Sequence, residues 1–213
     1  MNVAILADSR QKNEMTDWRW ASGVELIWAD SLEVLRMLSD IDVYFDMEFR
    51  MDTERNSIVK KLAPKPVFVN AVVATTKEIG DHVIRINGWP GFLARPIVEL
   101  AAGDGKKDEV RNIMGNLGLE YRMVGDLPGM VTPRIIAALV NEAFHTFEAG
   151  VSSKEEIDIA MKLGTNYPFG PFEWAGKIGL DNILALLEKL VRADGKSEIS
   201  ALLRSETYSE KPL

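Results

Sequence analysis

Short apolar runs separated by polar segments with helical spacing make up the first 125 residues. The pattern predicts strands over residues 3–7, 24–29, 42–45, 66–72, 83–86, 97–101 and 119–124. It predicts helices over residues 10–22, 31–38, 53–62 and 106–117. Strands that alternate with helices favour an α/β domain with a mostly parallel, doubly wound sheet.

Beyond residue 125 the apolar spacing changes to steps of one, three and four residues, which is typical of helices with one apolar face. The first such series is Ile135, Ile136, Leu139, Val140, Ala143, Phe144 and Phe147. Pro133 fits the first turn of this helix, and Gly150 fits a left-handed stop after it. We therefore predict an α/β domain over residues 1–125 followed by an all-α domain over residues 126–213.

Three further helices are predicted in this second domain. One begins at Ser153, forms a capping box with Glu156 and ends at Gly164. A short helix starts at Pro171, and a longer one is capped by Asp181. The apolar side chains exceed what one small domain needs to bury, so we predict a homodimer through these helices. The side chains meant are Phe144, Phe147, Phe172, Trp174 and the 184–190 leucine face.

Composition narrows the function classes. The 213 residues carry a net charge of −7, which argues against nucleic acid or an anionic membrane as the main partner. The chain has no cysteine, so disulfides, thiolate metal sites and a thiol nucleophile are excluded. No signal-peptide pattern or bilayer-length apolar run is visible, and we expect a cytoplasmic location. His82 and His145 have no clustered carboxylates beside them, so no metal site is predicted.

A set of short words in the second domain carries a family resemblance. They are Pro128-Gly129, Asn141-Glu142-Ala143, Glu148 with Gly150, Asp158 with Ala160-Met161-Lys162-Leu163-Gly164, and Tyr167-Pro168 followed by Gly170-Pro171-Phe172-Glu173. Together they resemble the C-terminal domain of the 3-hydroxyacyl-CoA dehydrogenases. In that family the helical domain forms the subunit contact and closes one side of the active cleft. The first domain resembles the family more weakly, through residues 40–43 with Glu48 and residues 97–100 with Gly103.

The resemblance implies a Rossmann-like first domain, NAD as cofactor and NAD-linked oxidation of a 3-hydroxyacyl-CoA in fatty-acid or butanoate metabolism. A dinucleotide fold needs glycines after its first strand so that backbone N–H groups can approach the diphosphate. The family has G-x-G-x-x-G there, whereas residues 7–12 of this chain contain no glycine. The predicted domain is therefore a degenerate Rossmann-like one. Asp30 stands where a ribose-binding acid is expected, or it caps the next helix, or it is a turn residue.

The family's catalytic positions are also changed. Its dyad histidine corresponds to Asn87, twelve residues before Glu99, which matches the glutamate that orients the histidine. Glu99 is otherwise a solvated carboxylate at a strand end. An asparagine side chain is no base near neutral pH. His82 is an alternative base, although its position does not match the dyad.

Two further regions depart from the family. Residues 70–73 replace a polar Ser-Asn-Thr-Ser word, and Pro133 replaces an asparagine. Only residues 31–39 separate the second and third strands, where the family has a long helical excursion that contributes to acyl-CoA binding. Two hypotheses follow: a 3-hydroxyacyl-CoA dehydrogenase-like protein with lost or altered activity, or a non-catalytic homodimeric binding or assembly protein that holds an acyl-CoA or a related small molecule.

Overall fold

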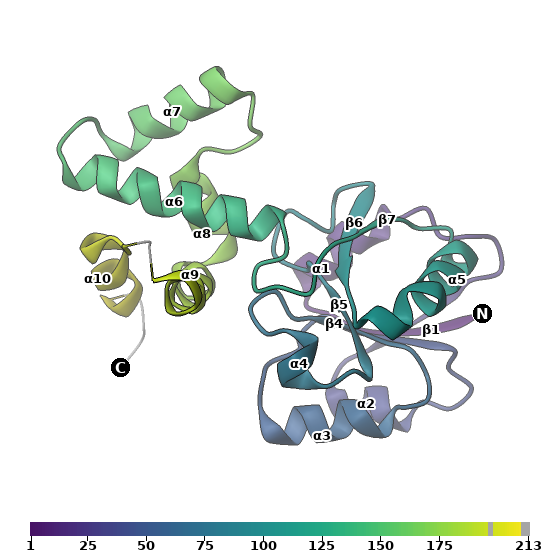
Figure 1. The fold of residues 1–213 in the computed structure, drawn as a ribbon. Coiled ribbons are helices and arrows are strands. Elements are labelled where there is room, and N and C mark those ends of the chain that lie inside the picture. Colours follow the sequence, from purple (N-terminus) through teal and green to yellow (C-terminus); the bar gives the residue numbers. More distant parts are fainter. Residues whose placement is uncertain (196–197, 210–213) are drawn as a thin grey trace. The chain divides into compact units, whose positions relative to one another are not determined.

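The computed structural model describes residues 1–195 and 198–209. The chain divides into two compact units, Met1–Met130 and Val131–Leu213, and each is described by itself (Figure 1). The predicted domain limits at 125 and 126 remain a prediction.

The first unit contains one seven-stranded sheet, and each of its strands falls within or beside a predicted run. The strands are β1 Asn2–Leu6, β2 Glu25–Ala29, β3 Val43–Asp46, β4 Val67–Asn70, β5 Val83–Ile86, β6 Ile97–Ala101 and β7 Glu120–Met123. Their order is β2-β1-β3-β4-β5-β6-β7. The first five strands are parallel, β6 is antiparallel to β5, and β7 is parallel to β6. The mostly parallel, Rossmann-like α/β prediction is confirmed.

Helices cover both faces of this sheet (Figure 1). They are α1 Ser9–Thr16, α2 Leu32–Met37, α3 Thr53–Lys61, α4 Thr76–Ile79 and α5 Lys107–Leu117, the last preceded by a 3-10 turn over Asp104–Lys106. Successive strand residues point to opposite faces. Val43 and Phe45 of β3 therefore share one apolar cluster with residues of α1 and α5, and Tyr44 shares the other with residues of α2, α3 and α4. The sheet is thus doubly wound, as predicted.

A buried arginine in β5 joins the middle of the sheet to the segment that follows β7. Arg85 is fully buried and donates to the carbonyl oxygens of Ala71 (2.8 Å) and Val72 (2.9 Å). It also forms an ion pair of 2.5 Å with Asp126. Burial alone raises the pKa of Asp126, but hydrogen bonds from Thr76 and Arg85 outweigh it, and the net result is a pKa below the ordinary value.

Replacing Asp126 by alanine should lower the free energy of unfolding by about 3 kcal/mol, because it leaves the buried Arg85 charge uncompensated. Asp108→Ala removes the exposed pair with Arg111 and should change it by less than about 1 kcal/mol. Urea unfolding at neutral pH measures both.

The folded pKa of Asp126 is depressed, so its contribution to the free energy of unfolding is present at neutral pH and disappears as pH falls through that pKa. A stability gap between wild type and Asp126→Asn that stays constant on acidification would contradict this assignment.

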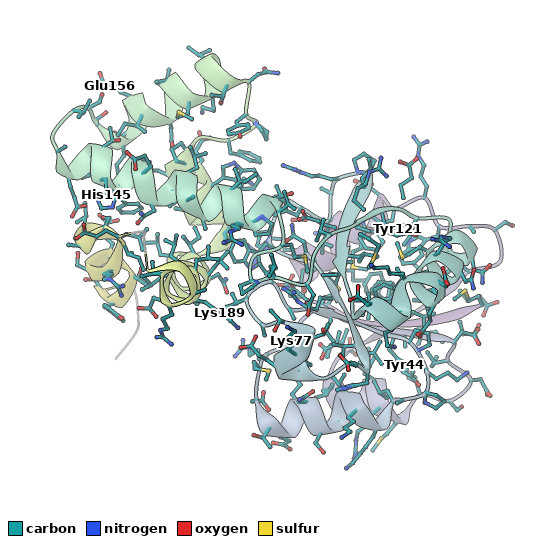
Figure 2. The ribbon with its side chains drawn as sticks, in the orientation of Figure 1. Tyr44, Lys77, Tyr121, His145, Glu156 and Lys189 are labelled. Carbon is teal, nitrogen blue, oxygen red and sulfur yellow. The ribbon has the colours of Figure 1, made fainter. Side chains whose placement is uncertain are left out.

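The second unit is all-α. Its helices are α6 Thr132–Glu148, α7 Lys154–Thr165, α8 Pro171–Ile178, α9 Leu180–Asp194 and α10 Ala201–Ser209. Pro133 lies in the first turn of α6, Gly150 is left-handed (φ 68°), and Ser153 and Glu156 form the predicted capping box. In the side-chain view, His145 marks α6 and Glu156 marks the start of α7 (Figure 2).

Two predicted helix limits in this unit are wrong, and one helix was not predicted. Helix α7 continues through Gly164 to Thr165, and its C-cap is Asn166, which adopts the left-handed conformation (φ 55°). Asp181 lies in the first turn of α9, whose cap is Gly179. Helix α10 has a weak apolar pattern, with only Leu203 and Thr207 buried. Its start is fixed by Glu148, which accepts a hydrogen bond from the N–H of Leu202 at 2.8 Å.

A buried carboxylate explains why several of the motifs that resemble the family, those around Asp158, Lys162 and Gly170-Pro171-Phe172-Glu173, occur together in this unit. Asp158 of α7 accepts the N–H groups of Phe172 (2.8 Å) and Glu173 (3.1 Å), and so satisfies the amino end of α8. Glu173 in turn accepts the N–H of Gly170 and pairs with Lys162. A Cβ atom on Gly170 would lie 2.5 Å from the Cα of Asp158, so the two helices approach too closely for any side chain there.

Gly170→Ala should therefore destabilise the helical unit by about 1–3 kcal/mol, because backbone must move to accept the methyl group. Gly164→Ala is the matched control. Nothing lies within 4 Å of a Cβ atom at this helical position, so alanine should be neutral or stabilising by up to about 1 kcal/mol. Thermal unfolding followed by circular dichroism separates the two. Equal melting temperatures for both variants would show that the close approach of α7 and α8 is not a constraint.

Candidate functional site

The carboxyl ends of β1, β3, β4 and β5 lie along one edge of the sheet, where an open α/β fold binds its ligands. The strand order reverses between β1 and β3, since β2 lies on the far side of β1. Helix α1 begins beside this point. Its amino end and the ends of β3, β4 and β5 therefore form the candidate site.

The amino end of α1 is occupied by the chain's own side chains. The Asp8 carboxylate accepts the N–H of Gln11 at 2.7 Å, and the Gln11 side chain accepts the N–H of Asp8 at 3.1 Å. Gln11 also donates from Nε2 to the carbonyl oxygen of Met47, just after β3, at 2.8 Å. A diphosphate would need backbone N–H groups here, and those of Asp8 and Gln11 are already bound to the Gln11 and Asp8 side chains. The residues present do not fit a dinucleotide at this place.

Asp30 does not complete a nucleotide site either. It is exposed, one residue beyond the end of β2. The cap of α2 is Ser31, whose hydroxyl accepts the N–H of Val34 at 3.2 Å. The cap interpretation of Asp30 is therefore wrong, and its assignment as a ribose ligand stays a prediction.

Asn87 and Glu99 come together as the family pattern implies. The antiparallel pairing of β5 with β6 places Ile86 opposite Leu100, so Asn87 lies opposite Glu99. The Asn87 N–H donates to the Glu99 carbonyl oxygen at 3.0 Å, and Asn87 Nδ2 donates to Glu99 Oε2 at 3.3 Å. Asn87 Oδ1 accepts the N–H of Trp89 at 3.3 Å. Asn87 is only 3% exposed, and both ends of its carboxamide are hydrogen-bonded.

This pair lacks a proton acceptor at the position of the family's histidine. A carboxamide neither takes up a proton near neutral pH nor changes charge. The Glu99 carboxylate is therefore held next to a group that it cannot activate as a base. His82 does not replace the histidine, because it precedes β5 at the opposite edge of the sheet from Asn87. Burial, with Lys60 and Lys106 nearby, lowers the pKa of His82.

A second amide contact, absent from the sequence analysis, holds the residue next to Asn87. Asn70, at the end of β4, accepts the N–H of Gly88 at 3.0 Å and donates to the Gly88 carbonyl oxygen at 3.3 Å. It also donates to the Met47 carbonyl oxygen at 3.1 Å. A Cβ atom on Gly88 would lie 2.7 Å from Asn70 Cγ, so glycine is required there. The only sign of this contact in the sequence was that Asn70 is the first of residues 70–73, which differ from the family's Ser-Asn-Thr-Ser motif.

The loop between β5 and β6 is fixed onto α1 by two further side chains that sequence reasoning missed. Glu14 accepts the N–H groups of Gly91 (2.9 Å) and Leu93 (3.1 Å). The indole N–H of Trp18 donates to the Leu93 carbonyl oxygen at 2.5 Å. The loop that connects Asn87 to Glu99 is therefore anchored at its middle, through Gly91 and Leu93.

The remaining predicted position, Pro133, is buried in the first turn of α6 in the helical unit, and its side chain supplies no hydrogen-bond donor. His145 Nε2 lies 3.3 Å from the Glu198 carbonyl oxygen and Nδ1 lies 3.6 Å from Glu148. Within residues 1–195 and 198–209, no group of three or more histidine, aspartate and glutamate side chains is placed to hold a metal ion. Over the same residues, no helix has the length and apolarity that crossing a membrane requires.

Comparisons with known proteins agree with this architecture. The family model "3-hydroxyacyl-CoA dehydrogenase, C-terminal domain" matches residues 129–211. The 3-hydroxybutyryl-CoA dehydrogenase of Bradyrhizobium diazoefficiens is 36% identical over 176 residues, which cover 74% of this chain and 59% of that protein. The enzyme of the same name from Clostridioides difficile is 29% identical over 190 residues, covering 87% of this chain and 66% of that protein.

A solved structure gives the same picture of the fold. The crystal structure of (S)-3-hydroxybutyryl-CoA dehydrogenase from Ralstonia eutropha superposes with a TM-score of 0.72 at 22% identity, covering 98% of this chain and 93% of that one. The two curated relatives described above are longer than the matched region, and the chain spans 59 to 66% of their length. Residues 129–211 therefore resemble the C-terminal domain of the 3-hydroxyacyl-CoA dehydrogenases, and the relatives that match along most of the chain carry the name 3-hydroxybutyryl-CoA dehydrogenase.

Proposed function

We propose that this chain is a 3-hydroxyacyl-CoA dehydrogenase-like protein whose dehydrogenase activity is lost or altered. The observation that supports this most directly is the Asn87–Glu99 contact, which keeps the geometry of the family's dyad without its base. Oxidising a secondary alcohol requires a group that accepts the hydroxyl proton as the hydride leaves. Losing a general base typically reduces the rate by roughly 10²–10⁴-fold.

The amino end of α1 supports the same proposal independently. NAD is the cofactor that the family resemblance implies, but Asp8 and Gln11 satisfy the backbone groups that a diphosphate would need. The Asp8 carboxylate also adds a negative charge next to an anionic ligand. Weak or absent dinucleotide binding and the missing base are separate defects. Each one by itself would reduce the dehydrogenase activity.

With acetoacetyl-CoA and NADH, the purified protein should show no loss of NADH absorbance above a blank, even at high protein concentration. A 3-hydroxybutyryl-CoA dehydrogenase run in the same buffer serves as the positive control. NAD and NADH should leave the melting temperature unchanged. Turnover accompanied by NAD-dependent thermal stabilisation would overturn the proposal. Stabilisation without turnover would agree with the missing base, but it would show that the amino end of α1 does not prevent dinucleotide binding.

The alternative is a non-catalytic homodimeric binding or assembly protein derived from the same family, with an acyl-CoA or related small molecule as ligand. Its location is proposed to be cytoplasmic, as the sequence predicts. This alternative is supported by the helical unit, in which the hydrogen bonds of Asp158, Gly170 and Glu173 do not depend on the site in the first unit. A ligand screen with CoA, acyl-CoAs, NAD(H) and NADP(H) by thermal shift distinguishes the two functions.

Only part of the surface that the sequence suggests for such a dimer is open, because Phe147 and Phe172 are partly exposed while the other named side chains are buried. Phe144, Trp174 and Leu184 are buried in the unit's own core, and so are Leu187 and Leu190. They are not available to a second copy. Helix α7 instead exposes Ile159 (52%) and Leu163 (83%), which are four residues apart and lie on one face. We place the proposed dimer contact on this face.

Replacing both Ile159 and Leu163 by glutamate should convert the dimer to a monomer, because charges would be buried without partners in the contact. Met37→Glu, on the equally exposed apolar position of α2, is the matched control and should leave the dimer intact. Light scattering coupled to gel filtration measures the molar mass. A wild-type monomer at micromolar concentration would refute the dimer itself.

A further inference from the structure

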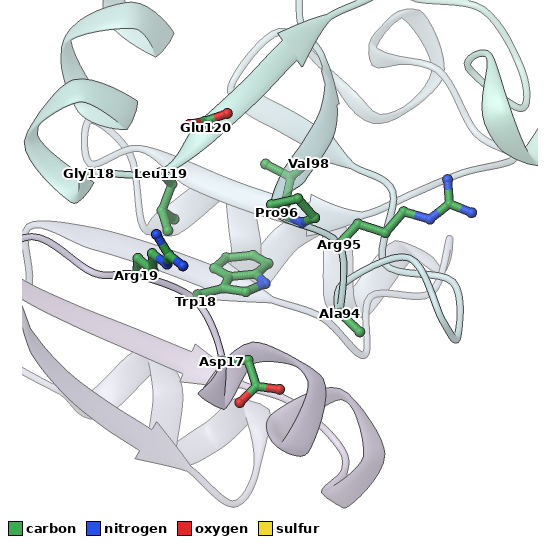
Figure 3. Close-up of a pocket in the computed structure, with 10 residues that line it drawn as sticks. All are labelled: Asp17, Trp18, Arg19, Ala94, Arg95, Pro96, Val98, Gly118, Leu119 and Glu120. Carbon is green, nitrogen blue, oxygen red and sulfur yellow. The ribbon is translucent and has the colours of Figure 1, made fainter. Parts of the chain in front are cut away.

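A hollow of about 360 Å³ opens in the first unit beyond the end of α1 (Figure 3). Its walls come from three segments: residues 17–19 after α1, residues 94–98 entering β6, and residues 118–120 entering β7. Trp18, Pro96 and Leu119 supply apolar walls and Arg19 stands at the rim, whereas the side chain of Arg95 extends away from them (Figure 3). The hollow involves none of the groups that the family uses for its chemistry.

The walls of this hollow are held before any ligand binds. The Trp18 indole is fixed by its hydrogen bond to the Leu93 carbonyl oxygen, and Glu14 fixes the backbone of the same loop. The Ala21 N–H donates to the Leu117 carbonyl oxygen at 2.8 Å, which joins the first segment to the third. Gly118 is left-handed (φ 74°), and a Cβ atom there would lie 2.9 Å from the Ala21 nitrogen. The lining combines apolar side chains with the charged Asp17, Arg19, Arg95 and Glu120, so a ligand that fits it needs both an apolar part and a charged group.

The charges at the rim define the ligand's chemistry. Within the described residues, neither Arg19 nor Arg95 has a carboxylate within ion-pair distance, and the Arg95 guanidinium lies 4.8 Å from the centre of the Phe92 ring. Unpaired guanidinium groups favour an anion. The rim also carries Asp17 and Glu120, whose negative charges penalise a dianion more than a monoanion.

We propose that this hollow binds a small aromatic monocarboxylate, with the ring against the Trp18 indole and the carboxylate at Arg19. The volume lies near the lower end of the range for ligand pockets, roughly 300–1,000 Å³, so it suits one or two fused rings and excludes a dinucleotide. Arg95 contributes a second, more distant positive charge. The proposal does not depend on the fate of the dehydrogenase chemistry.

The test uses 2-naphthoate with the full-length protein, followed by isothermal titration calorimetry and by saturation-transfer NMR of the ligand. Two probes separate the two parts of the recognition. 2-Naphthalenemethanol has the ring without the charge, and inorganic phosphate has charge without the ring. Naphthoate should bind, the alcohol should bind at least several-fold more weakly, and phosphate should give no measurable heat.

Arg19→Gln should weaken naphthoate binding by roughly tenfold, because it removes a charge-assisted contact, and Arg95→Gln should weaken it less. Arg36→Gln on α2 makes the same change of charge away from the hollow and should leave the affinity unchanged. Melting temperatures confirm that each variant is folded. Absence of naphthoate binding at millimolar concentration, equal binding of phosphate, or equal affinities for Arg19→Gln and Arg36→Gln would each overturn the proposal.

Discussion

Buried polar groups must be hydrogen-bonded, and this requirement shapes the carboxyl edge of the sheet. Gln11 and Asn70 both donate to the carbonyl oxygen of Met47, and Asn70 also holds Gly88 through its N–H and its carbonyl oxygen. Asn87 extends the series to Glu99. In an open α/β fold that binds a nucleotide, the ligand makes hydrogen bonds with some of the polar groups along this edge. Here the side-chain amides of Gln11, Asn70 and Asn87, from three segments, make these hydrogen bonds without a ligand.

The same requirement links the sheet to the end of the first unit. Arg85 is buried because its guanidinium has a carboxylate and several carbonyl oxygens around it, and Asp126 belongs to the segment that follows the last strand. In the helical unit Asp158 has the corresponding role, because its carboxylate accepts hydrogen bonds from the backbone N–H groups at the amino end of α8. Each unit thus contains a buried charged group with a defined set of partners, and the first unit has a second one in Asp46, which pairs with Arg55.

Sequence patterns were sufficient for the strands, because short apolar runs with helices between them leave few alternatives. They were insufficient for α4, which has four residues, and for α10, whose start depends on Glu148 more than fifty residues earlier in the chain. The Asn87–Glu99 contact was predictable because a family spacing coincides with an antiparallel register. The contacts of Gln11, Glu14 and Asn70 were not, since their partners are backbone groups of distant segments. Apolar content likewise did not reveal which side chains of the helical unit are buried by its own core.

The paired contacts of Asp8 and Gln11 have an evolutionary consequence. Exchanging Asp8 alone for glycine leaves the N–H of Gln11 without its acceptor, and exchanging Gln11 alone leaves the carbonyl oxygen of Met47 with one donor fewer. Each single step back toward a glycine-rich loop is therefore destabilising before it offers any benefit. A glycine-rich loop at this place would therefore require Asp8 and Gln11 to change together, so that no backbone group is left without its partner.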